Sequence, residues 1–222
     1  MLATMKVRAA VLREIGRPAP FAKSQPLGIE EIDLDPPGPG EVLVRIRAAG
    51  LCHSDLSVID GNRPRPMPMV LGHEAAGVVE AVGPRVTHLA PGDHVVAAFV
   101  PSCGHCIPCA TGRPALCEPG LRANTAGTLL SGERRLHDRA GEVHHHLGVS
   151  GFAQYAVLAG NSLVRVPSDL PFAEAALFGC AVITGVGAVV NTAAMPHGAS
   201  AAIVGLGGVV LAAMLAARML DA

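Results

Sequence analysis

The sequence predicts a mixed α/β fold, in which a β-rich region is followed by the beginning of an α/β unit. Short alternating segments run to about residue 170, and 26 glycines and 18 prolines supply the turns between them. Beyond that point the chain becomes alanine-rich, and residues 198–217 read as a buried strand, a glycine turn and a helix. We therefore expect two units, residues 1–180 and residues 181–222, the second starting with a helix.

The strands of the first unit are predicted from alternation and turn residues. In EVLVRIRAAG (41–50), Val42, Val44 and Ile46 fall on one side, as in a half-buried strand. AAGVVEAVGP (75–84) is a strand that ends at a Gly-Pro turn, and APGDHVVAAF (90–99) is a turn followed by a strand. Residues 118–150 are polar without a clear period, so we expect a long functional loop or lid there.

Composition and charge argue against some classes of partner. The net charge of −1, with both signs mixed along the chain, argues against a nucleic-acid partner. The first residues lack an apolar stretch with a cleavage site, so we expect a cytoplasmic protein. Residues 198–217 carry no charge and are long enough to span a membrane, but three central glycines and the strand-then-helix pattern favour a soluble α/β element. We therefore expect no membrane partner.

Four of the six cysteines form the pattern C-x2-C-x2-C-x7-C, and they are Cys103, Cys106, Cys109 and Cys117. Four thiolates satisfy tetrahedral zinc and leave no open position, which is typical of a structural site. A [4Fe–4S] cluster would continue x3-C-P, whereas here the last gap is seven residues and Glu118 follows. A reduced loop without metal is the remaining alternative, since cytosolic cysteines rarely form disulfides. We expect structural zinc.

The other two cysteines lie in GLCHSD and FGCAVITG, and a histidine lies in GHE. Taken alone, Cys52 or Cys180 would more often be a small buried hydrophobic residue. Together with His73 they would form a Cys₂His set, which leaves a fourth zinc position open and is the catalytic arrangement. Asp55 and Glu74 are then candidates for carboxylates that orient the ligands.

These motifs occur in the order GLCHSD, LGHEAAGVVEAVG, PGDHVV, CGHCIPC, GC and GLGGV. Their order and spacing resemble the zinc-dependent medium-chain alcohol dehydrogenase family, in the extended-loop version found in dimeric alcohol and formaldehyde-type enzymes. The resemblance implies a GroES-like catalytic domain followed by the start of a Rossmann-type cofactor domain. It also implies a catalytic zinc on Cys52, His73 and Cys180 and a structural zinc on the four clustered cysteines.

The resemblance further implies that the enzyme transfers hydride between a small alcohol or aldehyde and NAD, or NADP, and that the full-length form is a homodimer. The residues it places at this reaction are Ser54 as proton relay, Asp55 and Glu74 beside the zinc, Thr184 beside the nicotinamide, His53 at the cofactor pyrophosphate, Phe99 in the substrate channel, and Gly205, Gly207 and Gly208 in the dinucleotide turn.

Three departures from the family pattern stand out. Ser57 occupies a position where the family often has a histidine that completes the proton route. Val210 replaces the third glycine of the dinucleotide fingerprint, so we expect the helix to be pushed off the strand or repacked. The chain ends at Ala222, before the acidic residue expected about 20 residues beyond the glycines. We expect a truncated member with an exposed apolar tail that is inactive alone; the alternative is a zinc-stabilised pseudoenzyme or binding module.

Residues 144–146 are three consecutive histidines. On a strand, neighbouring side chains point to opposite faces, so the three cannot easily ligate one ion. We expect a solvated loop or the rim of a substrate cleft there.

Overall fold

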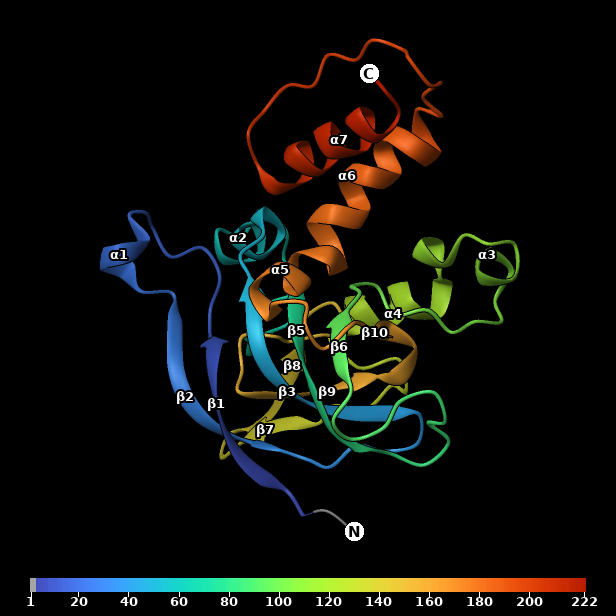
Figure 1. The fold of residues 1–222 in the computed structure, drawn as a ribbon. Helices are drawn as coiled ribbons and strands as arrows, with labels where there is room; N and C mark the ends of the chain where they lie inside the picture. The colour runs from blue at the N-terminus through green and yellow to red at the C-terminus, as the bar shows by residue number, and fades with distance from the viewer. Residues whose placement is uncertain (1–2) are drawn as a thin grey trace.

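The computed structural model describes residues 3–222 and is drawn as a ribbon in Figure 1. Its strands are β1 (Met5–Leu12), β2 (Leu27–Leu34), β3 (Glu41–Gly50), β4 (Met69–Val70), β5 (Glu74–Val82), β6 (His94–Ala97), β7 (Leu136–Asp138), β8 (Gly141–His145), β9 (Tyr155–Ala159) and β10 (Leu163–Arg165). Its α-helices are α1 (Phe21–Ser24), α2 (His53–Ile59), α3 (Ile107–Ala110), α4 (Glu118–Ala126), α5 (Phe172–Leu177), α6 (Ile183–Gly187) and α7 (Gly208–Met219). Short 3₁₀ turns cover Pro114–Leu116 and Gly160–Ser162, and π-helical segments cover Phe178–Val182 and Ala188–Thr192.

The strands form two sheets. One is a closed barrel in the order β1-β2-β7-β8-β4, and the other is a five-stranded sheet in the order β10-β6-β5-β3-β9. All pairings are antiparallel except β4 with β8, which is parallel. The barrel closes around buried aliphatic side chains that include Val11, Leu34 and Val143, and the second sheet buries Val44 and Leu158. This core is aliphatic, as the scarcity of aromatic residues requires.

The structure confirms the three predicted strands. It contradicts the expectation of an irregular loop at residues 118–150. EVLVRIRAAG is β3, and the predicted strands at 75–84 and 90–99 are β5 and β6. Residues 118–150 were expected to form an irregular loop, but they contain α4, β7 and β8. The sequence lacks a clear period there because the two strands are only three and five residues long and complete the barrel wall.

One continuous helical run, Phe172–Thr192, links the sheets to the C-terminal segment. It is long and apolar enough to cross a membrane by length and composition, and 39% of its most apolar window is buried within the fold. Its first part packs on the second sheet, where Ala175 and Ala176 contact Ala76. This packing accounts for the apolar character of that part of the run.

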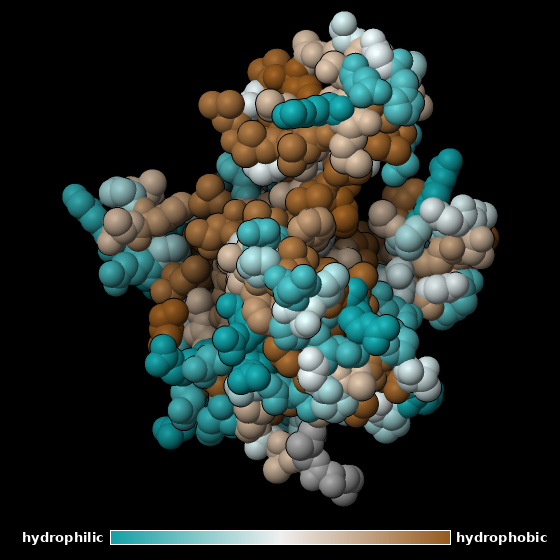
Figure 2. All heavy atoms as spheres, in the orientation of Figure 1, coloured by the Kyte–Doolittle hydropathy of each residue, from teal (hydrophilic) through white to brown (hydrophobic). Residues whose placement is uncertain are grey.

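The strand predicted at the start of residues 198–217 does not form, and residues 200–206 have no regular structure. A parallel strand needs a neighbour to satisfy its backbone groups, and none lies beside this segment in the described part of the chain. α7 packs instead on α6, above the sheets in Figure 1. Val204 is 92% exposed and Leu206 88%, as expected for an exposed apolar tail, and Figure 2 shows hydrophobic residues gathered over this part of the molecule.

Candidate metal centres

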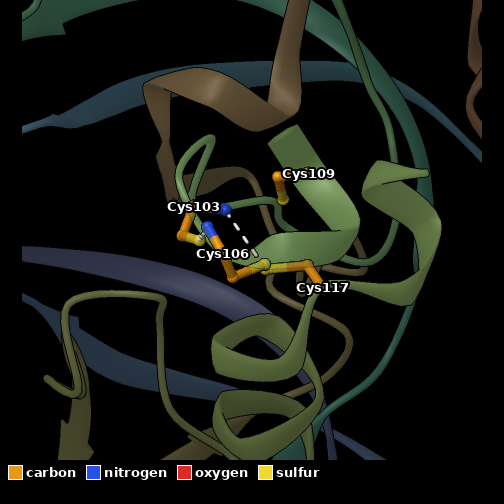
Figure 3. A group of neighbouring side chains, drawn as sticks. All are labelled: Cys103, Cys106, Cys109 and Cys117. Atoms are coloured by element: carbon orange, nitrogen blue, oxygen red, sulfur yellow. Dashed lines mark hydrogen bonds between the residues drawn. The ribbon is translucent and has the colours of Figure 1, made fainter. Parts of the chain in front are cut away.

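The four clustered cysteines come together in a small lobe formed by α3, the following 3₁₀ turn and the start of α4. Their sulfur atoms all lie within 4.8 Å of one another. Figure 3 shows the four side chains. Backbone N–H groups point at the sulfurs: Cys103 N lies 3.2 Å and Gly120 N 3.3 Å from Cys117 Sγ, and Cys106 N lies 3.3 Å from Cys103 Sγ. Such N–H donors favour the thiolate form that metal binding needs.

The donor chemistry of this lobe fits a divalent cation. Backbone N–H groups, chiefly that of His105, lower the pKa of Cys103 to about 6. Burial raises the pKa of Cys109 to about 12, and the neighbouring sulfurs add to the rise. Four sulfurs this close cannot all carry negative charge unless a cation offsets their repulsion, and a tetrahedral four-sulfur set is the preferred environment of zinc.

A second set of donors lies at the end of the five-stranded sheet. Ligand atoms of Cys52, His73, Glu74 and Cys180 all lie within 4.8 Å of one another. Cys52 precedes α2, His73 directly precedes β5, Glu74 is the first residue of β5, and Cys180 comes from the π-helical segment. Burial, with the charges of Cys52 and Glu74, raises the pKa of the Cys180 thiol, so a cation is needed to hold this thiolate too. Glu74, which was expected as a carboxylate beside the zinc, has its carboxylate among these donor atoms.

Cys180 owes its position to the π-helical segment Phe178–Val182. This segment presses against β6 so closely that a Cβ on Gly179 would collide with the carbonyl oxygen of Ala97. The Phe99 N–H also lies 3.4 Å from the Gly179 carbonyl oxygen. A π-turn inserts one extra residue into a helix and commonly marks a functional position. Here it brings Cys180 to the donor cluster.

Asp55 and His146 lie behind His73. Asp55 Oδ2 is 3.1 Å from His73 Nδ1, Asp55 Oδ1 is 3.3 Å from His146 Nε2, and Asp55 Oδ1 also accepts the Gly72 N–H at 2.9 Å. Although burial opposes it, the approach of His146 and His73 lowers the pKa of Asp55, so the carboxylate is charged. The ring N–H directions lie off the carboxylate oxygens, so the two histidine contacts are close but poorly aligned.

The histidine triplet is therefore not solvated, and this expectation was wrong. His145 and His146 are each 1% exposed, and His144 is half-buried with its Nδ1 2.9 Å from the carbonyl oxygen of Pro68. The reason is the parallel pairing of β8 with β4, which sets His144 opposite Met69 and His145 opposite Val70. Such long-range pairing leaves no local trace in the sequence.

The remaining predicted residues of this centre lie on α2 and beside His73. Ser54 is half-buried and His53 exposed in the first turn of α2. Ser57 turns back on its own helix, with its hydroxyl donating to the His53 carbonyl oxygen at 3.0 Å. Phe99 lies edge-on to the His73 ring, with centroids 5.6 Å apart.

The glycine turn lies next to the same helical run. α7 begins at Gly208, where an added Cβ would lie 3.2 Å from the side chain of Ala181, the residue after Cys180. Gly205 has a φ of +119°, and an added Cβ would lie 3.0 Å from Val210. Thr184, predicted beside the nicotinamide, is exposed on α6.

A comparison with known families decides the affiliation of the chain. The family model described as the alcohol dehydrogenase GroES-like domain matches residues 38–168, which is more than half of the chain. The chain belongs to this family. Its β-rich region is the GroES-like domain of the family, as the motifs predicted.

Individual relatives agree with this membership. The chain is 44% identical to putative alcohol dehydrogenase D of Mycobacterium tuberculosis over 92% of its own length and 53% of the relative's. It is 40% identical to S-(hydroxymethyl)glutathione dehydrogenase of Synechocystis over 98% of its length and 57% of the relative's. A solved alcohol dehydrogenase zinc-binding domain protein from Burkholderia ambifaria is 44% identical, with a TM-score of 0.88. The match includes 98% of this chain and 57% of that protein. The chain thus spans about half the length of the curated relatives it matches.

Two solved structures similar to this chain contain a metal or a nicotinamide cofactor. An alcohol dehydrogenase from Pyrobaculum aerophilum, 32% identical with a TM-score of 0.75, is bound to cobalt and zinc, and the chain covers 57% of it. Acetophenone reductase from Geotrichum candidum, 29% identical with a TM-score of 0.74, is in complex with NAD, and the chain covers 55% of it.

Sequence reasoning missed one residue of this site. His146 was assigned to a solvated loop or the rim of a substrate cleft, and it lies buried beside Asp55 instead. Nothing in the sequence signals that His146 meets Asp55, 91 residues away.

Proposed function

We propose that residues 1–222 form the zinc-binding catalytic part of an NAD(P)-dependent alcohol dehydrogenase that interconverts a small alcohol and its aldehyde or ketone. The observation that carries the proposal is the convergence of Cys52, His73, Glu74 and Cys180, three of them buried, on one point. We further propose that residues 1–180 are the catalytic domain and residues 181–222 the first elements of the cofactor domain. A homodimeric full-length form and a cytoplasmic location complete the proposal.

The four-cysteine lobe would hold the structural zinc. Its four sulfurs fill a tetrahedral shell, so the lobe offers no position for substrate. Its role is to fix the loop between β6 and α4.

The second centre would hold the catalytic zinc through Cys52, His73 and Cys180, with the Glu74 carboxylate beside them. When bound, such a zinc acts as a Lewis acid that lowers the pKa of an alcohol hydroxyl. The chain's own residues do the rest. Asp55 fixes the orientation of the His73 ring, Phe99 covers its edge and limits the access of water, and Ser54 is positioned on α2 to take the alcohol proton.

The cofactor would lie along the start of α7. The N–H groups at the N-terminus of this 12-residue helix suit a pyrophosphate, and Gly207 and Gly208 keep side chains out of its way. His53 and Thr184 would contact the same cofactor. NAD is the proposed form, with NADP as the alternative.

A second candidate function rests on the unpaired residues 200–206. Because the first strand of the cofactor domain does not form in the described chain, the 222-residue polypeptide could serve as a zinc-stabilised binding module without turnover. This candidate predicts the same two metal centres and no hydride transfer.

Two measurements on the chain test these candidates, and the first tests whether the metal centre takes up alcohol. We expect cobalt(II) placed at the Cys52 centre to change its visible spectrum when a primary alcohol is added, because the alcohol enters the metal's coordination shell. The Cys52→Ser variant should not show this change. An unaltered cobalt spectrum at saturating alcohol would contradict the proposed catalytic centre.

The second measurement follows the reduction of NAD⁺ or NADP⁺ by the zinc-loaded chain with a panel of alcohols. We expect none from the 222-residue polypeptide, because residues 200–206 do not form the strand that a cofactor sheet requires. Turnover that Cys52→Ser abolishes would support the enzyme and overturn the binding module.

A further inference from the structure

We propose that His146 is a positioning residue of the catalytic centre, which holds Asp55 and through it the metal-binding face of His73. The inference rests on the proposed function, since it concerns the same zinc centre, and it adds a residue that the family motifs in this chain do not include. His146 would touch neither substrate nor cofactor.

The geometry is a chain of three buried side chains. His73 and His146 are each 1% exposed and Asp55 3%, so none of the three exchanges its contacts with bulk water. The Oδ2 atom of Asp55 lies 3.1 Å from His73 Nδ1, and its Oδ1 atom lies 3.3 Å from His146 Nε2. Because His73 turns Nδ1 to Asp55, Nε2 is the nitrogen left for the donor cluster.

A buried carboxylate keeps its charge and its orientation through the polar groups that face it. The only well-aligned hydrogen bond to Asp55 among the described residues comes from the Gly72 N–H. If His146 left, Oδ1 would keep that N–H but lose the ring nitrogen 3.3 Å away, and the carboxylate would be free to rotate away from His73. The imidazole would then lose the partner that fixes its tautomer and ring plane, which is how such carboxylates support metal ligands.

Contacts between aromatic rings also support a positioning role for His146. His146 packs edge-on against His73 at 5.6 Å between centroids, and Phe99 packs edge-on against His73 at the same distance. The planes of both neighbouring rings are steeply inclined to the His73 ring, at 73° for His146 and 71° for Phe99. His146 therefore restrains this ligand both directly and through Asp55.

A rival use of the same residues is a separate metal site. Ligand atoms of Asp55, His73 and His146 lie within 4.8 Å of one another. That use would require His73 to bridge two cations through both nitrogens, while its Nδ1 already faces the Asp55 carboxylate. The single-zinc arrangement with a supporting carboxylate needs no such bridge, and we argue for it.

The test measures zinc release from the chain to a competing chelator. The four-cysteine lobe serves as an internal control, because its sulfurs form a donor group separate from the one that contains His146. We expect His146→Phe, which keeps most of the ring volume but removes the ring nitrogen that faces Asp55, to weaken zinc binding at the Cys52 centre about tenfold. His146→Gln, which keeps an N–H near the Nε2 position, should stay within about threefold of the unsubstituted chain.

A double-mutant cycle then asks whether His146 acts through Asp55. In an Asp55→Ala background, His146→Phe should change zinc affinity less than about twofold, because the intermediary is gone. Secondary structure by circular dichroism and retention of the lobe zinc show whether each variant is folded. If Asp55→Ala fails to fold, the contrast between the phenylalanine and glutamine variants still decides.

Three results would overturn the inference: no change with phenylalanine, an equal loss with glutamine, or the same loss with and without Asp55. A third zinc that disappears with His146→Phe would establish the rival metal site instead. If the unsubstituted chain binds no zinc at the Cys52 centre, the proposed function itself fails. If it binds zinc that His146→Phe leaves unaffected, only the positioning role fails.

Discussion

His145 is fully buried in the barrel wall, and its two ring nitrogens have different partners. The Arg135 N–H donates to Nε2 at 3.1 Å, so the proton of the neutral ring sits on Nδ1, which faces Ser150 Oγ at 3.4 Å. Burial, with the nearby charges of Arg134 and Arg135, lowers the pKa of His145 to about 3. The folded chain therefore keeps this ring neutral at pH values where an exposed imidazole is charged.

Because the folded chain keeps the His145 ring neutral, we predict that the free energy of unfolding decreases in acid. Below about pH 6.5 the unfolded chain binds a proton that the folded chain does not, so the free energy of unfolding falls as the pH falls toward 3. One such group contributes a slope of up to about 1.4 kcal/mol per pH unit in this window and none above it. Urea unfolding of the chain and of His145→Gln at several pH values measures the slope.

The glutamine variant should be less stable at neutral pH and should show a shallower decline between about pH 6.5 and 3. Other groups that titrate in acid are present in both proteins, so only the difference between the two profiles counts. Equal slopes in both would show that His145 is not the buried neutral group described here.

At the residue scale, the sequence predicted the four-cysteine cluster because its spacing carries the signal, whereas Cys52 and Cys180 were grouped through the family resemblance. Cys103 and Cys106 lie three residues apart, and the structure brings all four sulfurs together as the spacing implies. The roles of His145 and His146 could not be predicted, because they depend on β8 pairing with β4 about 75 residues earlier. Local pattern carries no information on such a partner.

At the scale of elements, the helical run Phe172–Thr192 offers a matched pair of glycines. A side chain on Gly179 would collide with the backbone of β6, whereas one on Gly187 would meet only Asn191 Nδ2 at 3.8 Å. Gly179→Ala should therefore destabilise the fold by about 1–3 kcal/mol through overpacking and should move Cys180. Gly187→Ala should be neutral or stabilising by up to about 1 kcal/mol, since alanine favours a helix.

Urea unfolding measures both glycine variants, and zinc analysis reports on Cys180. Equal stability of the two would contradict the close approach of the π-helical segment to β6. A loss of stability in Gly179→Ala with full zinc affinity would mean that the helix shifts without disturbing the donor cluster.

Local pattern predicted a strand that alternates over many residues and failed where a strand is short or its neighbour is missing. The alternation of Val42, Val44 and Ile46 predicted β3, which pairs on both sides within its sheet. The run at residues 200–205 has the same apolar character, but no strand lies beside it in the described residues. The π-helical segment Phe178–Val182 was not foreseen, and it packs against β6, which is distant in sequence.

At the scale of the whole molecule, apolar surface is concentrated around α7. Val204, Leu206 and Met219 are 92%, 88% and 79% exposed, and Met214 and Leu215 line an adjacent groove of about 840 Å³. This groove lies away from both metal centres. Exposed apolar patches of this kind favour association.

The chain should therefore self-associate as its concentration rises, and the double variant Val204→Ser/Leu206→Ser should do so less. Sedimentation velocity measures association, and the binding of a hydrophobic dye measures exposed apolar surface. Ile107→Ser provides the control, because Ile107 is 78% exposed but lies on the four-cysteine lobe. A reduction as large in the control would show that α7 is not the associating surface.

The measurement that tests the central claim most directly is the metal content of the purified chain. We predict two zinc ions per chain, with one lost in Cys103→Ser and a different one lost in Cys52→Ser. Only the first variant should lower the melting temperature markedly, because only the four-cysteine zinc fixes a lobe of the fold. A chain that folds without zinc, carries iron and sulfide, or loses both ions in either variant would contradict the account.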